Sequence, residues 1–275
     1  MLRPVKYLGQ HFLSDKNIAK KITEAINPQP DDVIVEIGAG EGFLTEQFAG
    51  KVKKIFAVEI DKRAVDFLKV RFGDENLKDK VEILHCDFLK LDLNQFGEFG
   101  KIRLVGNIPY SITSSIIFKA IENRQIVKDL TIMVQLEVAL RIVSSPNVKD
   151  YSILSVMCQA YSKPEILFRV SRNVFYPKPK VSSAVIRLDF EMSQLAERII
   201  DDAFFKKVVK TVFNKRRKIL RNTLSEIFDE TVLSKIDFDL TKRPEQLTVE
   251  EFIELSNSLY RVTNQVVGKI KADVK

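Results

Sequence analysis

Short runs of apolar and β-branched residues alternate with segments of helical periodicity through the first half of the chain. Such runs predict buried parallel strands at residues 33–37, 55–59, 81–85, 102–106 and 130–135. The segments between them carry apolar residues at helical spacing and predict helices at residues 43–49, 62–72 and 114–122. Asp15 is expected to cap an earlier helix that ends before Pro28. This alternation predicts a parallel α/β sheet.

The pattern changes after Tyr151. A helix is expected at residues 153–161, and two β-rich runs at 166–170 and 184–190 are expected to close the sheet as a pair. Beyond about residue 191 the strand pattern disappears and only helical periodicity remains. We therefore expect two domains: an α/β catalytic domain of residues 1–190, and a smaller, all-helical, basic domain of residues 191–275.

The composition favours a folded protein with a polyanionic partner. The 275 residues are 45% hydrophobic and 29% charged, and 44 Lys and Arg outweigh 37 Asp and Glu to give a net charge of +7. Two cysteines without a C-x-x-C pair, and only two histidines, predict neither a disulfide framework nor a metal site. No leader-like stretch and no apolar run of about 18 residues occurs, so we expect a soluble, cytoplasmic protein.

A glycine-rich loop follows the first predicted strand. Its sequence, Gly38-Ala39-Gly40-Glu41-Gly42, lets the backbone turn tightly and approach a ligand closely. The dinucleotide fingerprint G-x-G-x-x-G would need a glycine where Phe43 stands, so the loop fits an NAD site poorly. Gly38 and Gly40 are candidate cofactor contacts; the alternative is an ordinary tight turn.

Acidic residues follow the next two strands. Glu59 lies about 20 residues past Gly38, the spacing at which an acid accepts hydrogen bonds from ribose hydroxyls. Asp87 follows the third strand and is expected to accept a hydrogen bond from an adenine amino group. Alone, Glu59 could form a salt bridge and Asp87 could cap a helix, whereas Asp61 is expected to cap one. Together they predict a nucleoside site at the carboxyl edge of the sheet.

The segment Asn107-Ile108-Pro109-Tyr110 follows the fourth strand. The exocyclic N6 of adenine is a poor nucleophile because its lone pair is delocalised into the ring. Hydrogen bonds from N6 to the Asn107 side-chain carbonyl and the Ile108 main-chain carbonyl would favour a pyramidal nitrogen and free that lone pair. Pro109 restricts the backbone of Ile108, and Tyr110 offers a face for base stacking. A plain turn is the alternative.

Two further segments are candidates for the same site. In Gly9-Gln10-His11-Phe12-Leu13, the apolar residues either cover a cofactor or anchor the first helix. In residues 175–183, two prolines stiffen a loop that holds Phe175 or Tyr176 as a second wall of a base pocket, unless these aromatic residues belong to the core.

The segment Lys206–Arg221 carries eight basic residues and no acid, and its apolar residues recur at roughly helical spacing. It predicts an amphipathic helix with a cationic face that binds RNA phosphates, because unopposed cations repel one another. A solvated face and a lipid surface are the alternatives. The candidate RNA-binding residues are Lys206, Lys207, Lys210, Lys215, Arg216, Arg217, Lys218 and Arg221.

Taken together, these motifs resemble the ribosomal RNA adenine N6-dimethyltransferases of the KsgA family over nearly all of residues 4–260. The segments occur in the family's order: GQHFL, EIGAGEG, VEID, CDF, GNIPYSITS, VFYPKPKVSSAVIRL and FNKRRKILRNTL. The last two are the most specific, because macrolide-resistance rRNA methylases share the cofactor motifs and NIPY but match these segments less well. His11 stands where many members carry Asn.

The resemblance implies a Rossmann-like, seven-stranded methyltransferase sheet with a C-terminal helical domain. It also implies transfer of two methyl groups from S-adenosyl-L-methionine to each of two adjacent adenosines near the 3′ end of 16S rRNA, during small-subunit biogenesis, by a monomer. The implied cofactor contacts are His11, Leu13, Gly38, Gly40, Glu59, Asp87 and Asn107. The implied catalytic residues are Asn107, Ile108, Pro109, Tyr110 and Phe175, the two aromatic residues flanking the base.

Two other functions remain open from the sequence. One is adenine N6-methylation of 23S rRNA or DNA, and the other is a non-catalytic RNA-binding or assembly role on the same fold.

Overall fold

The computed structural model describes residues 12–13, 15–74, 77 and 79–273. The chain divides into two compact units. The first, here the sheet unit, consists of the chain up to Ala139 together with Lys163–Glu191. The second, here the helical unit, consists of Leu140–Ser162 and the chain from Met192 onward.

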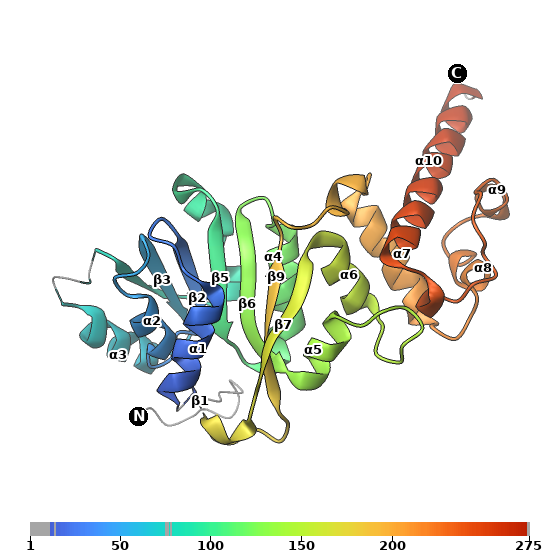
Figure 1. Cartoon of the computed structure of the whole chain (residues 1–275). Helices are drawn as coiled ribbons and strands as arrows, with labels where there is room; N and C mark the ends of the chain where they lie inside the picture. Colours follow the sequence, from blue (N-terminus) through green and yellow to red (C-terminus); the bar gives the residue numbers. More distant parts are fainter. Residues whose placement is uncertain (1–11, 14, 75–76, 78, 274–275) are drawn as a thin grey trace. The chain divides into compact units, whose positions relative to one another are not determined.

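Seven strands form one sheet in the order β4-β3-β2-β5-β6-β9-β7 (Figure 1). In chain order they are β2 (Val33–Ile37), β3 (Lys54–Glu59), β4 (Val81–His85), β5 (Ile102–Asn107), β6 (Val127–Gln135), β7 (Lys163–Val170) and β9 (Ser183–Asp189). Strands β2 to β6 pair in parallel, whereas β9 runs antiparallel to both of its neighbours, β6 and β7. The predicted parallel sheet with a closing pair of strands is confirmed. A short pair, β1 (Phe12–Leu13) and β8 (Phe175–Tyr176), lies apart from the sheet.

Helices cover the sheet because its strands are apolar on both faces; β2, for example, is buried at every position. On one face, Ile34, Ile55 and Val105 join a core cluster with residues of α1 and α2. On the other, Phe56 packs against Phe96, with ring centroids 4.6 Å apart. The helices of the sheet unit are α1 (Lys16–Ile26), α2 (Phe43–Phe48), α3 (Lys62–Phe72) and α4 (Thr113–Glu122), and α5 (Leu136–Ile142) begins in the sheet unit and ends in the helical unit.

The strand order reverses beside β2, which pairs with β3 on one side and β5 on the other. The connections that leave the carboxyl ends of β2 and β5 therefore diverge to opposite faces of the sheet. In open α/β sheets this is the place where a crevice for ligands forms.

At the opposite edge, a buried ionic network ties α1 to the sheet. The guanidinium of Arg103 contacts Asp129 at 2.6 Å and Asp32 at 2.7 Å, and donates to the main-chain carbonyl of Ile26 at 2.9 Å. Asp129 is fully buried and also contacts Arg187 at 2.8 Å. Because Ile26 is the last residue of α1, the network fixes where that helix ends against the sheet.

The helical unit contains α6 (Ile153–Tyr161), α7 (Asp202–Asn214), α8 (Leu220–Leu224), α9 (Glu230–Leu233) and α10 (Val249–Asp273). It differs from the expected second domain, residues 191–275, because residues 140–162 belong to it. Tyr161 explains this difference: its hydroxyl donates to Asp202 at 2.9 Å and its ring meets Phe205 edge-on. No helix in the described ranges is both long and apolar enough to cross a bilayer.

Candidate active site

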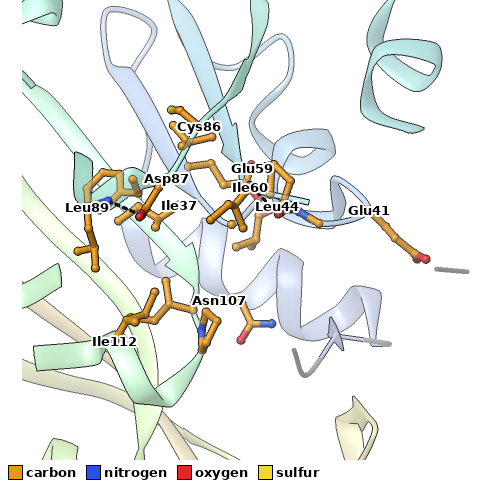
Figure 2. A pocket seen from close by; sticks show the side chains of 18 of the residues that line it. Ile37, Glu41, Leu44, Glu59, Ile60, Cys86, Asp87, Leu89, Asn107 and Ile112 are labelled. Carbon is orange, nitrogen blue, oxygen red and sulfur yellow. Dashed lines mark hydrogen bonds between the residues drawn. The ribbon is translucent and has the colours of Figure 1, made fainter. Parts of the chain in front are cut away.

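A cavity of about 280 Å³ opens at the carboxyl ends of β2, β3, β4 and β5. It therefore lies where the strand order reverses. Figure 2 shows Glu59, Asp87 and Asn107, which come from three different strand ends, around one space. The predicted site residues that line it are Gly38, Gly40, Glu59, Asp87, Asn107, Ile108 and Pro109.

The glycine loop is held to β3 by main-chain hydrogen bonds. The Gly38 N–H donates to the carbonyl of Val58 at 2.9 Å, and the Gly40 N–H donates to Glu59 Oε2 at 2.8 Å. Gly42 begins α2 at φ +77°, and a Cβ there would lie 2.5 Å from the ring of Phe72. Only glycine satisfies both the left-handed backbone and this close approach.

The carboxylate of Glu59 is buried and already engaged by the protein. Besides Gly40, it accepts hydrogen bonds from the N–H groups of Ile60 at 2.8 Å and Asp61 at 2.9 Å, both at Oε1. A carboxylate offers roughly four acceptor positions, so about one remains for a ligand. Asp61 itself caps α3, as predicted, by accepting from the N–H of Arg63.

Glu36 is a second buried carboxyl of the cavity, and the sequence analysis gave it no role. It is 2% exposed, and its Oε2 accepts a hydrogen bond from Thr45 Oγ1 at 2.6 Å. Burial raises the pKa of Glu36 to about 8; the Thr45 hydrogen bond opposes this and the charge of Glu59 adds to it. Glu36 is therefore largely protonated at neutral pH.

Asp87 combines the two roles considered for it. Its Oδ1 caps the short 3₁₀ helix Phe88–Lys90 by accepting from the N–H of Leu89 at 2.9 Å. The residue is half-buried and lines the cavity. Its neighbour Cys86 lines the cavity too.

Asn107 ends β5 on the side of the cavity opposite Glu59 (Figure 2). The preceding Gly106 allows β5 to pass close to β2, since a Cβ there would lie 2.6 Å from the carbonyl oxygen of Ile37. Ile108 and Pro109 follow along the cavity wall. The NIPY segment therefore stands beside the glycine loop, as its place after the fourth strand predicts.

The aromatic residues predicted to flank a base do not line this cavity. The hydroxyl of Tyr110 shares a hydrogen bond of 2.7 Å with Ser183 Oγ, an interaction that the sequence analysis missed. Burial raises the pKa of Tyr110, and the Ser183 hydrogen bond opposes the rise. Phe175 is 5% exposed and belongs to the core cluster, as in the second of the two alternatives that the sequence left open for it. Leu13 pairs through its backbone with Phe175, and His11 lies outside the described residues.

The lining of the cavity is acidic. Glu41, Glu59 and Asp87 contribute to it, whereas Glu36 is largely protonated and adds little charge; the side chain of Glu41 points away from the other labelled residues in Figure 2. No Lys, Arg or His occurs among the described residues that line the cavity. Such a site favours a nucleoside that carries positive charge and disfavours a phosphorylated one. Within the described ranges, no group of three or more His, Cys, Asp and Glu is arranged to hold a metal ion.

The basic segment of the helical unit differs from its prediction in two ways. It is not one helix, because α7 ends at Asn214 and α8 begins at Leu220. Nor are its cations unopposed, since three pair with acids from elsewhere in the unit: Lys215 with Glu226, Arg216 with Glu245 and Arg221 with Glu230. Lys207, Lys210, Arg217 and Lys218 are exposed and form no ion pair with the described residues.

The chain is similar to proteins of one kind along most of its length. The family model for ribosomal RNA adenine dimethylase matches residues 3–261. "Ribosomal RNA small subunit methyltransferase A" of Bacteroides thetaiotaomicron is 42% identical over 259 residues, covering 94% of this chain and 95% of that protein. The protein of the same name from Mycoplasma capricolum is 38% identical, covering 94% and 98%.

Two solved structures share the fold. A dimethyladenosine transferase from Plasmodium falciparum superimposes with a TM-score of 0.78 at 25% identity, covering 92% of this chain and 98% of that one. The 23S rRNA methyltransferase ErmE superimposes with a TM-score of 0.67 at 26% identity, covering 90% and 99%.

Proposed function

This chain belongs to the ribosomal RNA adenine dimethylase family, and from that premise we propose its substrate and mechanism. It dimethylates N6 of two adjacent adenosines in a loop near the 3′ end of 16S rRNA, with S-adenosyl-L-methionine as methyl donor. It acts as a monomer in the cytoplasm, on the small ribosomal subunit or its precursor, and so takes part in small-subunit biogenesis.

The observation that carries this proposal is the acidic cavity that ends at Asn107. S-adenosylmethionine is a nucleoside without phosphates, and when bound it supplies a methyl group on a positively charged sulfonium. The residues present fit that group, because carboxyl groups line the cavity and no basic side chain does so among the described residues. The phosphates of a dinucleotide cofactor would instead place negative charge beside these carboxyl groups, with no basic side chain among the described lining residues to offset it.

Each strand end has a separate role in holding the cofactor. Glu59 accepts a hydrogen bond from one ribose hydroxyl, at the acceptor position that remains beside its three main-chain donors. Asp87 Oδ2 accepts a hydrogen bond from the adenine amino group, while Oδ1 continues to accept the hydrogen bond from the N–H of Leu89. Gly38 and Gly40 let the main chain come close to the ligand. The family resemblance adds His11 and Leu13 as further contacts.

The NIPY segment prepares the target nitrogen. The Asn107 side-chain carbonyl and the Ile108 main-chain carbonyl accept hydrogen bonds from the two N–H groups of adenine N6. Pro109 restricts the backbone of Ile108 and so helps to hold its carbonyl in place. Holding N6 in line with the methyl group provides most of the rate enhancement. The proton of the methylated amine is lost to solvent. The base must first leave its stack, which is easier in an RNA loop than in a duplex.

Tyr110 and Phe175 flank the flipped base in the proposed complex. Because Phe175 is buried in the core cluster, its ring can reach the base only after residues 175–176 and their partner strand shift. Ile108 and Pro109 already line the cavity, so these two residues need no such movement, and Tyr110, which is half-buried, follows them directly along the chain.

The helical unit binds the RNA backbone through its cations. The strongest contributions come from Lys207, Lys210, Arg217 and Lys218, which have no ion-pair partner among the described residues. Lys206, Lys215, Arg216 and Arg221 contribute less, since they are engaged within the protein.

The decisive experiment offers methyl-labelled S-adenosylmethionine with unmethylated 30S subunits, 50S subunits or duplex DNA to the full-length protein. Label at N6 of two adjacent adenosines of 16S rRNA supports the proposal. Label in 50S rRNA or in DNA instead refutes it in favour of the other methyltransferase activities. If the protein binds RNA but no substrate becomes labelled, the result supports a non-catalytic RNA-binding factor. Asn107→Ala serves as control, because it should abolish transfer and leave RNA binding nearly unchanged.

A further inference from the structure

The connection between β7 and β9 is strongly basic. No acidic residue occurs between Glu165 and Asp189. Four cations in this stretch are exposed, and we call them the connection cations: Arg169, Arg172, Lys178 and Lys180. They were not among the candidates that the sequence analysis named for RNA.

The connection cations have no acidic partner among the described residues, whereas other basic residues nearby do. Arg187, on β9, contacts Asp129 at 2.8 Å and Asp189 at 3.1 Å. By contrast, the side-chain hydrogen bond of Arg172 goes to a main-chain oxygen, that of Lys180 at 3.4 Å. Arg169 lies near the end of β7 and the other three lie on the connection that follows, and four exposed like charges in one short stretch repel each other. A bound polyanion would relieve that repulsion.

An aromatic ring stands among these cations. Strand β8 turns Phe175 into the core and Tyr176 outward, so that Tyr176 is 57% exposed. Its large apolar face in water is well suited to stack on a base, and a combination of cations with aromatic rings is typical of surfaces that bind single-stranded nucleic acid.

The connection lies at the same edge of the sheet as the cavity. Its last residue leads into Ser183, which pairs with Gln135 at the end of β6, and β6 pairs with β5 beside Asn107. The hydrogen bond of 2.7 Å between Ser183 Oγ and the Tyr110 hydroxyl joins the first residue after the connection to the NIPY segment. An RNA strand that delivers a base to Asn107 therefore passes beside the connection.

We propose that the β7–β9 connection is a second RNA-binding surface, located on the sheet unit, that holds the single strand next to the target adenosine. The connection cations contact its phosphates and Tyr176 stacks on one unpaired base. This inference rests on the proposed function and adds to it a binding surface near the reacting base, separate from the cations of the helical unit.

The test measures binding of a short, fluorescein-labelled oligoadenylate to the full-length protein over a series of salt concentrations. For Lys178→Gln/Lys180→Gln, the slope of log K against log salt should become shallower by roughly 0.7 for each phosphate that the variant no longer neutralises. The matched control is Lys51→Gln/Lys80→Gln, which removes two exposed lysines before β3 and β4, at the opposite edge. The control should keep the slope of the unmodified protein.

Tyr176 is tested separately. Tyr176→Ala should weaken binding by about 5- to 100-fold without changing the salt slope, as expected when one base is no longer stacked, and Tyr176→Phe should restore it. Unchanged slopes in the double lysine variant, or unchanged affinity in Tyr176→Ala, would overturn the proposal. So would a double lysine variant that binds anionic lipid vesicles more weakly but oligoadenylate as well as the unmodified protein does.

Failure of this inference is distinguishable from failure of the proposed function, because binding is measured without methyl transfer. If the wild-type protein methylates 30S subunits and the variants bind oligoadenylate normally, only the proposal of the second RNA-binding surface is refuted. If the protein methylates no substrate but the double lysine variant shows the shallower salt slope, only the proposed reaction is refuted.

Discussion

Replacement of Glu36 by Gln should change how the stability of the protein depends on pH. Gln has nearly the same size as Glu, and its amide oxygen can still accept the hydrogen bond that Thr45 Oγ1 donates at 2.6 Å. The substitution therefore removes the titrating proton and leaves the packing in place. Any difference between the two proteins that varies with pH then reports on Glu36 itself.

The magnitude follows from the pKa of Glu36, which burial raises from its ordinary value of 4.5 to about 8. Between these values the unfolded chain has released the proton and the folded protein still holds it. The unfolded state thus binds fewer protons, and stability falls as pH rises through this window, by about 1.4 kcal/mol per pH unit. Below the window the contribution is fully present, and above it no further decrease occurs.

Urea denaturation of both proteins at several pH values measures this effect. The advantage of Glu36→Gln over the unmodified protein should grow by about 3.5 kcal/mol between pH 5 and pH 8. The matched control is Glu98→Gln, which makes the same replacement at an exposed position with no ion-pair partner among the described residues and should show no such trend. A difference between Glu36→Gln and the unmodified protein that stays constant with pH would show that the Glu36 carboxyl is ionised in the folded state.

Three further predictions concern other parts of the sheet unit. Asp129→Ala should lower the free energy of unfolding by about 3–5 kcal/mol, because it leaves the buried Arg103 without its closest partner; a decrease below about 1 kcal/mol in chemical denaturation would contradict this. Tyr110→Phe and Ser183→Ala should each reduce the methylation rate, and the double variant should be no slower than either single one, since all three remove the same hydrogen bond; additive effects would show independent roles. Gly106→Ala would place a Cβ 2.6 Å from a main-chain oxygen of β2, so calorimetry should show weaker S-adenosylmethionine binding, and unchanged affinity would mean that the strands yield without disturbing the cavity.

The arrangement of the cavity was predictable because it depends on local patterns. Apolar runs mark the strands, and parallel strands bring their carboxyl ends to one edge. Glu59, Asp87 and Asn107 were therefore expected together, and the structure places them around one cavity. The spacing of a residue from its own strand is enough for this kind of prediction.

Features that depend on distant partners were not predictable. Lys215 and Arg221 looked unopposed because Glu226 and Glu230 lie outside the basic segment. Tyr110 and Ser183 are 73 positions apart, so no local pattern relates them. The same holds for the helix at residues 153–161, whose apolar sequence predicts burial and does not indicate which unit it joins.

The three main-chain hydrogen bonds to Glu59 have a consequence for turnover. The bond from the Gly40 N–H ties the glycine loop to the end of β3, and those from Ile60 and Asp61 fix the Glu59 carboxylate, so hydrogen bonds within the protein order the cradle for the ribose. Cofactor association then spends little conformational entropy on ordering that loop. An enzyme that methylates one nitrogen twice must discard demethylated cofactor and admit a fresh molecule between transfers, and a preorganised cradle lowers the cost of each such exchange.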